Sequence, residues 1–263
     1  MLICLEGTDY SGKSTFADTM LQEWLNAHPS HTGKIVPVGA PPKPEPGYDP
    51  RAWRAKLVTG LIDQLNEHHD PQNPLDLVIF DRFHVGMPIY GPLFRKEFDK
   101  DGFGDIGRSG FQAVDAAVHR HCGITVHVAT PLFELLKRAP NREDEYLDAN
   151  SDGMTREEQL SLLWKRYFEF FSTVGLQMDS FIGHAIDPRD FASDREVRTI
   201  HDEANTLCKS VETQTTWPGY SPASKRYFKM WASGRKTMHG QKHVACYIIG
   251  LAQIRSARAY RFK

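Results

Sequence analysis

One eight-residue loop near the start of the chain limits its fold more than any other feature. The segment Gly7-Thr8-Asp9-Tyr10-Ser11-Gly12-Lys13-Ser14 follows the apolar run at residues 2–5 and leads into a helical pattern. It has the spacing G-x-x-x-x-G-K-[ST], which forms a phosphate-binding loop when it lies between a strand and a helix. A glycine-rich turn that only joined the two elements would leave the Lys-Ser pair unexplained. The sequence therefore predicts a P-loop α/β fold.

The residue types in this loop suit the binding of phosphate groups. Glycines let backbone N–H groups approach phosphate oxygens, and the following helix presents its positive N-terminal end. In such a loop the lysine ammonium reaches the β- and γ-phosphates, and the serine hydroxyl can ligate Mg²⁺. We therefore expect ATP and Mg²⁺ as cofactors. The expected ATP-binding residues are Gly7, Ser11, Gly12, Lys13, Ser14 and Thr15.

Apolar patterns along the rest of the chain alternate between strand and helix. A first helix should end near residues 28–29, and a stiff proline-rich loop should occupy residues 39–50. Strands are predicted at 2–5, 35–38, 75–80, 124–128 and 181–186, those at 35–38 and 75–80 as buried strands. Helices are predicted at 52–68, 88–98, 110–121, 131–138, 155–171 and 194–211. Residues 140–154 are polar and loop-like. The alternation predicts a three-layer P-loop NTPase fold with a five-stranded parallel sheet.

Basic residues gather at the end of the sequence. Residues 217–263 hold 10 Lys/Arg and no Asp/Glu, although the net charge of the whole chain is −1. Aromatic side chains alternate with these charges, a mixture suited to phosphate contact and base stacking. Two interpretations stay open: the segment packs on the acidic core, or it contacts DNA. We divide the chain into a core at 1–211 and a basic C-terminal appendage at 212–263.

Cysteine and histidine spacing gives no sign of a metal centre. Cys4, Cys122, Cys208 and Cys246 lie far apart, so we expect reduced and mostly buried thiols. Histidine pairs occur at 68–69 and at 119 and 121, but no carboxylate or cysteine stands at the spacing of a metal site. We therefore expect these histidines to lie at the surface. No apolar run approaches the roughly 18 residues of a membrane span. We therefore expect no membrane contact and a cytoplasmic protein, or one in the host cytoplasm if it is viral.

Charged residues end the predicted strand at 75–80, where open α/β sheets bind ligands. Residues 81–91 read DRFHVGMPIYG and resemble the motif D-R-Y-x-x-S-x-x-A-Y-Q of thymidylate kinase-type P-loop kinases. Residues 6–15 are similar to that family's E-G-x-D-x-x-G-K-[ST]-T, and residues 138–154 resemble its arginine-containing lid. The resemblance covers residues 1–211. It implies a nucleotide kinase, commonly a homodimer.

The resemblance also assigns residues to the acceptor. It implies that Asp9 approaches the sugar and phosphate, that Arg82 holds the acceptor phosphate with Phe83 beside it, and that Asp81 positions Mg²⁺ through water. Tyr90 falls where the family keeps a tyrosine that crowds a 2′-hydroxyl. Plainer roles stay open: a structural ion pair for Asp81 and Arg82, and helix packing for Tyr90.

A catalytic arginine is expected in the lid. Tyr10 replaces the arginine that some members of the family carry inside the loop, so a positive charge must come from elsewhere to stabilise the transferred phosphoryl group. Arg138 and Arg142 are the candidates, although Arg142 stands among acidic residues and could be a solvated loop charge. The lid should close over the nucleotide and exclude water.

Departures from the family concern the base of the acceptor. The family's R-E-P-G-G-like segment reads GAPPKP at residues 39–44, and its serine and glutamine are Gly86 and Gly91 here. Three hypotheses follow. The first is transfer of the γ-phosphate from ATP to a deoxynucleoside monophosphate, dTMP foremost. The second is phosphorylation of a hydroxyl on a modified base, such as 5-hydroxymethyluracil, within DNA. The third is a nucleotide-binding switch without catalysis.

Overall fold

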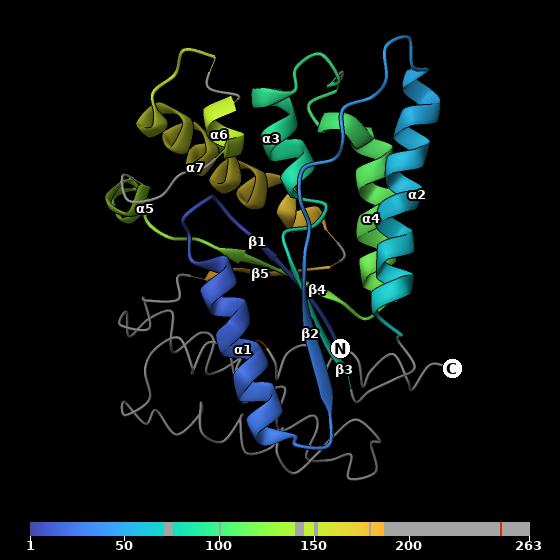
Figure 1. Cartoon of the computed structure of the whole chain (residues 1–263), viewed down its shortest axis with the longest axis vertical. Helices are drawn as coiled ribbons and strands as arrows, with labels where there is room; N and C mark the ends of the chain where they lie inside the picture. The colour runs from blue at the N-terminus through green and yellow to red at the C-terminus, as the bar shows by residue number, and fades with distance from the viewer. Residues whose placement is uncertain are drawn as a thin grey trace.

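The computed structural model contains one parallel β-sheet with helices packed on both faces (Figure 1). It describes residues 1–70, 76–99, 101–139, 145–149, 152–178, 180–186 and 248. The strands are β1 (Leu2–Glu6), β2 (Thr32–Pro37), β3 (Asp76–Asp81), β4 (Ile124–Val128) and β5 (Phe181–Ile186). Their order is β2-β3-β1-β4-β5, and all neighbouring pairs are parallel. The predicted α/β class with a parallel sheet is confirmed.

Alternate residues of the central strand face two different helix layers. Leu2 and Cys4 belong to a buried cluster shared with α2 (Pro50–His68), α4 (Gly107–Arg120) and α7 (Arg156–Thr173). Successive side chains of a strand point to opposite faces, so Ile3 and Leu5 lie on the other side, where α1 (Lys13–Ala27) contacts the first three strands. The remaining helices are α3 (Gly86–Phe94), α5 (Leu132–Arg138) and α6 (Glu145–Ala149), with the short 3-10 helices η1 (Gly104–Ile106) and η3 (Gly175–Gln177).

Local capping signals in the sequence set where two long helices begin. Thr155 caps α7, and a capping box forms because the Glu158 side chain accepts from the Thr155 backbone N–H at 2.8 Å. Asp49 caps α2 by accepting from the Arg51 backbone N–H at 3.0 Å. Pro50 then occupies the first position of α2, where a missing N–H costs nothing. The helix therefore starts inside the segment that we expected to be loop.

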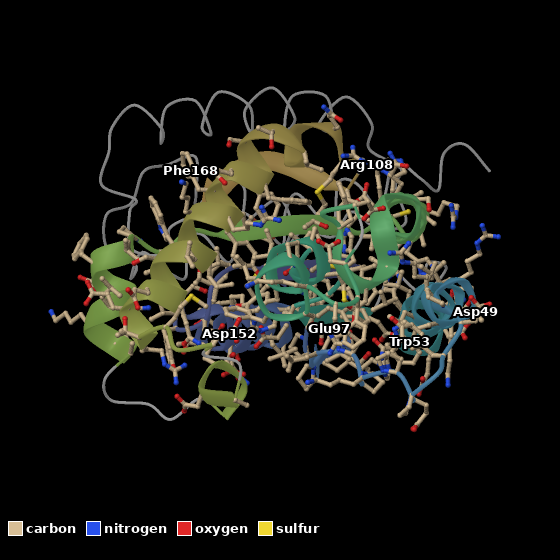
Figure 2. The ribbon with its side chains drawn as sticks, turned by 90° about the horizontal axis from the view of Figure 1, so that it is seen from above. Asp49, Trp53, Glu97, Arg108, Asp152 and Phe168 are labelled. Carbon is tan, nitrogen blue, oxygen red and sulfur yellow. The ribbon has the colours of Figure 1, made fainter. Side chains whose placement is uncertain are left out.

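Several sequence-based predictions were wrong in detail. The strand predicted as buried, β2, lies at the edge of the sheet and its residues are exposed or half-buried, because only β3 pairs with it. Helix α3 ends at Phe94, four residues early, because the chain turns after Arg95. The lid is not wholly loop-like, since it contains α6. Phe168 of α7 is 58% exposed and lies on the outer side of the helix (Figure 2), although large aromatic side chains are usually buried.

His69 was also expected at the surface and is buried instead. Its Nδ1 lies 3.3 Å from Nδ1 of His121, and burial lowers the pKa of His69 to about 3. The imidazole is therefore neutral at physiological pH. Cys4 and Cys122 are buried, and neither forms a disulfide within the described part of the chain.

Other predictions fall outside the described residues. These are the roles or placements of Arg142, Cys208 and Cys246, the helix at 194–211, and the basic appendage, of which only the buried Ile248 is described. Within the described part of the chain, no helix is long and apolar enough to cross a membrane.

Candidate functional site

The glycine-rich loop lies between β1 and α1, as its sequence spacing predicted. Gly12 has the positive φ of 87° that glycine adopts without strain, and it is the N-cap of α1. The helix therefore starts at Lys13 and directs its first backbone N–H groups toward the loop. Ser11 is buried, and its carbonyl oxygen accepts from the Thr130 hydroxyl at 2.7 Å. These features are the ones that a helix N-terminus offers to an anion.

Lys13 is held inside this loop. It is 5% exposed, and its Nζ donates to the carbonyl oxygens of Gly7 at 2.8 Å and Thr8 at 2.7 Å. The neighbouring imidazole of His127 adds no competing charge, because burial, assisted by Lys13, lowers the pKa of His127 to about 3. The ammonium is thus the positive charge at the centre of the loop.

Ser14 and Asp81 meet at the carboxyl edge of the sheet. The Ser14 hydroxyl donates to Oδ2 of Asp81 at 2.5 Å. They meet because Ser14 lies in the first turn of α1, and Asp81 ends β3, which pairs with β1. Thr15, the next residue, is exposed on α1. Hydroxyl and carboxylate oxygens are ligands that Mg²⁺ accepts alongside water, so this pair fits the expected metal. No group of three or more His, Cys, Asp or Glu residues in the described chain forms a metal site by itself.

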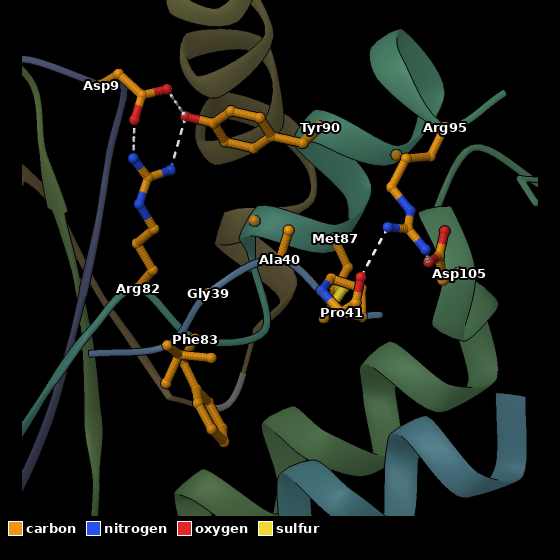
Figure 3. Close-up of a pocket in the computed structure, with 13 residues that line it drawn as sticks. Asp9, Gly39, Ala40, Pro41, Arg82, Phe83, Met87, Tyr90, Arg95 and Asp105 are labelled. Atoms are coloured by element: carbon orange, nitrogen blue, oxygen red, sulfur yellow. Dashed lines mark hydrogen bonds and ion pairs between the residues drawn. The ribbon is translucent and has the colours of Figure 1, made fainter. Parts of the chain in front are cut away.

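Asp9, Arg82 and Tyr90 form one hydrogen-bonded group beside the loop (Figure 3). Arg82 pairs with Oδ1 of Asp9 and donates from Nη1 to the Tyr90 hydroxyl at 2.8 Å. The Tyr90 hydroxyl in turn donates to Oδ2 of Asp9 at 2.6 Å. Burial raises the pKa of the Tyr90 phenol above its usual value against the opposing charge of Arg82, so the hydroxyl stays protonated. The structure therefore brings Asp9 together with Arg82 and Tyr90, two residues of the 81–91 motif far along the sequence, and we had assigned all three to the acceptor.

Glu6 fixes the turn that carries Arg82. The Glu6 side chain is fully buried, and its Oε1 accepts from the backbone N–H groups of Phe83 at 2.8 Å and Val85 at 3.1 Å. Arg82 adopts a positive φ of 68° in this turn. In the sequence, Glu6 is only the first residue of the loop motif, and its role in positioning the turn was not predicted. The contact joins residues 77 and 79 positions apart, which no local pattern reveals.

Arg138 contacts the loop from the side of the lid. Its Nη1 donates to the Tyr10 carbonyl oxygen at 2.9 Å. Arg138 is the last residue of α5, so the helix end holds its guanidinium near the backbone of the glycine-rich loop. Of the two arginines that were candidates, Arg138 is therefore placed beside the loop. Arg142 lies outside the described residues.

A cavity of about 290 Å³ opens next to Arg82. Its walls come from the segment after β2, the turn after β3, helix α3 and η1 (Figure 3). The lining residues are Asp9, Val38, Gly39, Ala40, Pro41, Arg82, Phe83, Gly86, Met87, Tyr90, Gly91, Arg95 and Asp105. Sequence reasoning missed Arg95 and Asp105, because charged residues in a helix end and a glycine-rich bend look like surface residues. Burial raises the pKa of the Asp105 carboxyl, and the charge of Arg95 opposes this shift.

Two solved structures are similar to this chain at low identity. The YorR protein from Bacillus subtilis, solved in complex with phosphorylated GDP, shares 19% identity over 78% of this chain and 96% of its own, with a TM-score of 0.46. Deoxyadenosine kinase from M. mycoides, solved with bound dCTP, shares 16% over 78% of this chain and 100% of its own, with a TM-score of 0.41. No protein-family model and no curated protein sequence matches this chain. Both TM-scores are below 0.5, and the thymidylate kinase resemblance stays a prediction.

Proposed function

We propose that this protein transfers the γ-phosphate of ATP to a deoxynucleoside monophosphate, with dTMP as the foremost acceptor. One observation supports this most strongly. The Asp9, Arg82 and Tyr90 group joins the loop, which contains Asp9, to the cavity, which all three residues line. A donor phosphate on the loop and an acceptor phosphate on Arg82 would face each other.

The chain's own residues supply positive charge and hydrogen bonds rather than covalent chemistry. Backbone N–H groups at the start of α1 bind phosphate oxygens, and Lys13 exchanges its carbonyl partners for them. Arg138 stabilises the charge that spreads over the transferred group, and Arg82 orients the attacking phosphate oxygen. Ser14 and Asp81 would hold Mg²⁺, which neutralises charge on the β- and γ-phosphates when bound.

ADP formation with separate acceptors tests this proposal. Purified full-length protein is given ATP and Mg²⁺ alone, then with each common deoxynucleoside monophosphate. We expect ADP release to rise at least about 10-fold above basal hydrolysis with the true acceptor. Lys56→Ala on the exposed face of α2 serves as a control that should match the wild type. Equal rates with and without every acceptor would overturn the proposal and favour a nucleotide-binding switch.

A DNA-base acceptor is a separate arm of the same assay. This hypothesis was motivated by the basic segment 217–263. Only Ile248 of that segment is among the described residues, so the hypothesis stays a prediction. Duplex and single-stranded DNA containing 5-hydroxymethyluracil are incubated with γ-labelled ATP. Label in this DNA, with none in any mononucleotide, would replace the mononucleotide proposal by the DNA-base hypothesis.

A further inference from the structure

The polar side chains that line the cavity are all engaged with other groups of the protein. Among the described lining residues they are five: Asp9, Arg82, Tyr90, Arg95 and Asp105 (Figure 3). Arg82 pairs with Asp9, and the Tyr90 hydroxyl bonds to both. At the other end of the cavity, Nη2 of Arg95 lies 2.6 Å from Oδ2 of Asp105. The Arg82 end is proposed to bind the acceptor phosphate, so only the Arg95 end could read a base.

Arg95 and Asp105 belong to the structure of the cavity wall. Arg95 is 5% exposed and Asp105 is 2% exposed. Nε of Arg95 and both carboxylate oxygens of Asp105 have essentially no accessible surface. Nη1 of Arg95 donates to the Pro41 carbonyl oxygen at 2.8 Å, and Nη2 donates to that of Pro42 at 3.1 Å. This ion pair therefore ties the segment after β2 to α3 and η1, and it presents almost no polar surface to a base.

The rest of the cavity lining is apolar side chains and glycines. The apolar side chains are Val38, Ala40, Pro41, Phe83 and Met87. Methionine is unbranched and flexible, so Met87 can adjust to ligands of different shape. A site that bonds polar groups of its ligand rejects analogues lacking them by about 10⁴- to 10⁵-fold, whereas an apolar pocket discriminates far less. Walls of this kind favour weak discrimination between bases.

Two glycines of α3 differ in the space beside them. Gly86 and Gly91 both line the cavity, and both stand where the thymidylate kinase motif has a polar side chain. At Gly91 the space is filled, because a Cβ there would lie 2.5 Å from Cα of Gly104 in η1. At Gly86 the space is open, since nothing lies within 4 Å of a Cβ. The cavity therefore has room at Gly86 that a side chain in that position would reduce.

We propose that the acceptor cavity admits purine bases as well as pyrimidines, and that Gly86 provides the room for the larger ring system. The base is held by shape and apolar contact, and none of the side chains that the structure describes reads its hydrogen-bonding edge. The inference rests on the proposed function, because it takes Arg82 as the phosphate end of the acceptor. It widens the acceptor class from dTMP to deoxynucleoside monophosphates of both ring sizes.

Equilibrium binding to the full-length protein tests the inference without requiring turnover. Isothermal titration compares dTMP with dAMP, with dGMP and with N3-methyl-dTMP, which lacks the ring N–H of thymine. We expect each of these three to bind at most about 10-fold less tightly than dTMP, because no side-chain hydrogen bond to the base is lost. Binding of any of them that is weaker than this limit would overturn the inference, and so would the absence of binding by all four.

Gly86→Val tests where the room for the larger base comes from. A rigid side chain in the open space should weaken the binding of dAMP and dGMP by about 10-fold or more relative to dTMP. Gly60→Val is the matched control, because Gly60 lies on the exposed face of α2 and nothing lies within 4 Å of a Cβ there either. It should keep the wild-type affinities. A folded Gly86→Val protein with wild-type affinities would overturn the role of Gly86.

The wild-type titrations decide on the purine class even if Gly86→Val fails to fold. Binding of both ring sizes without phosphate transfer to any acceptor would overturn the proposed function alone. Transfer to dTMP by a protein that rejects purines would overturn the inference alone.

Discussion

The two ends of the candidate site are built in different ways. The proposed phosphate-binding end is formed by eight consecutive residues, Gly7 to Ser14, and the groups that it offers to phosphate are largely backbone N–H groups at a helix start. The cavity end takes its walls from the segment after β2, the turn after β3, α3 and η1, which packing and the polar contacts of Arg95 bring together. A site made of backbone in one loop tolerates little change. A site made of side chains from several segments can change its ligand while the loop stays the same.

The positively charged side chains at the two ends also have different partners. Lys13 donates to carbonyl oxygens of its own loop, partners that phosphate oxygens can replace. Arg82 and Arg95 are each paired with a carboxylate, Asp9 and Asp105. Variants at the phosphate-binding end should therefore reduce catalysis with every acceptor. Variants at the cavity end should change which acceptor is used.

Lys13→Ala should have the largest effect. Removing the central ammonium should reduce phosphate transfer by about 10³-fold or more, because the charge that spreads over the γ-phosphate loses its main protein partner. Initial rates at saturating ATP with each acceptor measure this loss. Lys56→Ala is the control. A loss confined to one acceptor would break the contrast between the two ends.

Arg138→Ala should lower kcat by roughly 10² to 10³, the effect of removing one preorganised donor from a transition state. Lys137→Ala, the exposed neighbour on α5, provides a control that removes the same charge at the next position. Steady-state kinetics of both variants at varied ATP concentrations measure kcat and show whether only Arg138→Ala lowers it. An Arg138→Ala enzyme with the kcat of Lys137→Ala would transfer the lid role to Arg142.

Arg82→Ala should act mainly on the acceptor. Losing charge-assisted bonds to the acceptor phosphate should raise the acceptor KM roughly 10- to 100-fold, while the KM for ATP stays within about twofold. The measurement is a pair of saturation curves, one for each substrate, with Arg51→Ala on the exposed start of α2 as control. A change in the KM for ATP alone would show that Arg82 serves the donor.

Gly91→Ala and Gly86→Ala compare a glycine in close backbone contact with a glycine that has open space around it. The new methyl at Gly91 would meet the Gly104 backbone, so we expect a loss of about 1–3 kcal/mol in the free energy of unfolding and a raised acceptor KM. Nothing lies within 4 Å of a Cβ at Gly86, so its variant should keep wild-type stability within about 1 kcal/mol. Urea denaturation measures both. Equal destabilisation would contradict the close approach of η1 to α3.

The sequence predicted those parts of the molecule that depend on neighbouring residues. The loop at Gly7–Ser14 and the charged end of β3 both follow from short patterns, and the structure contains both. Sheet order is not local, so the half-exposed edge position of β2 could not be read from its apolar residues.

The cavity shows the same limit more strongly. In the sequence, Gly91 is only a departure from the family's glutamine. In the structure its missing side chain allows close contact with the backbone of Gly104, 13 residues further on, and Asp105 follows Gly104 at the cavity wall. Arg95 follows a short helix and resembles any surface charge until its bonds to Pro41 and Pro42 are seen. Residues whose role depends on a partner far along the chain carry no signal in one sequence.

The fate of the γ-phosphate tests most directly whether the two ends act as one site. Full-length protein is mixed with γ-labelled ATP and dTMP, and the products are separated into inorganic phosphate and deoxynucleoside diphosphate. We predict that the wild type places the label on dTDP, that Arg82→Ala does so only at raised dTMP, and that Lys13→Ala forms almost none. Label that appears in inorganic phosphate alone, at a rate unaffected by any mononucleotide or DNA acceptor, would contradict a transfer site.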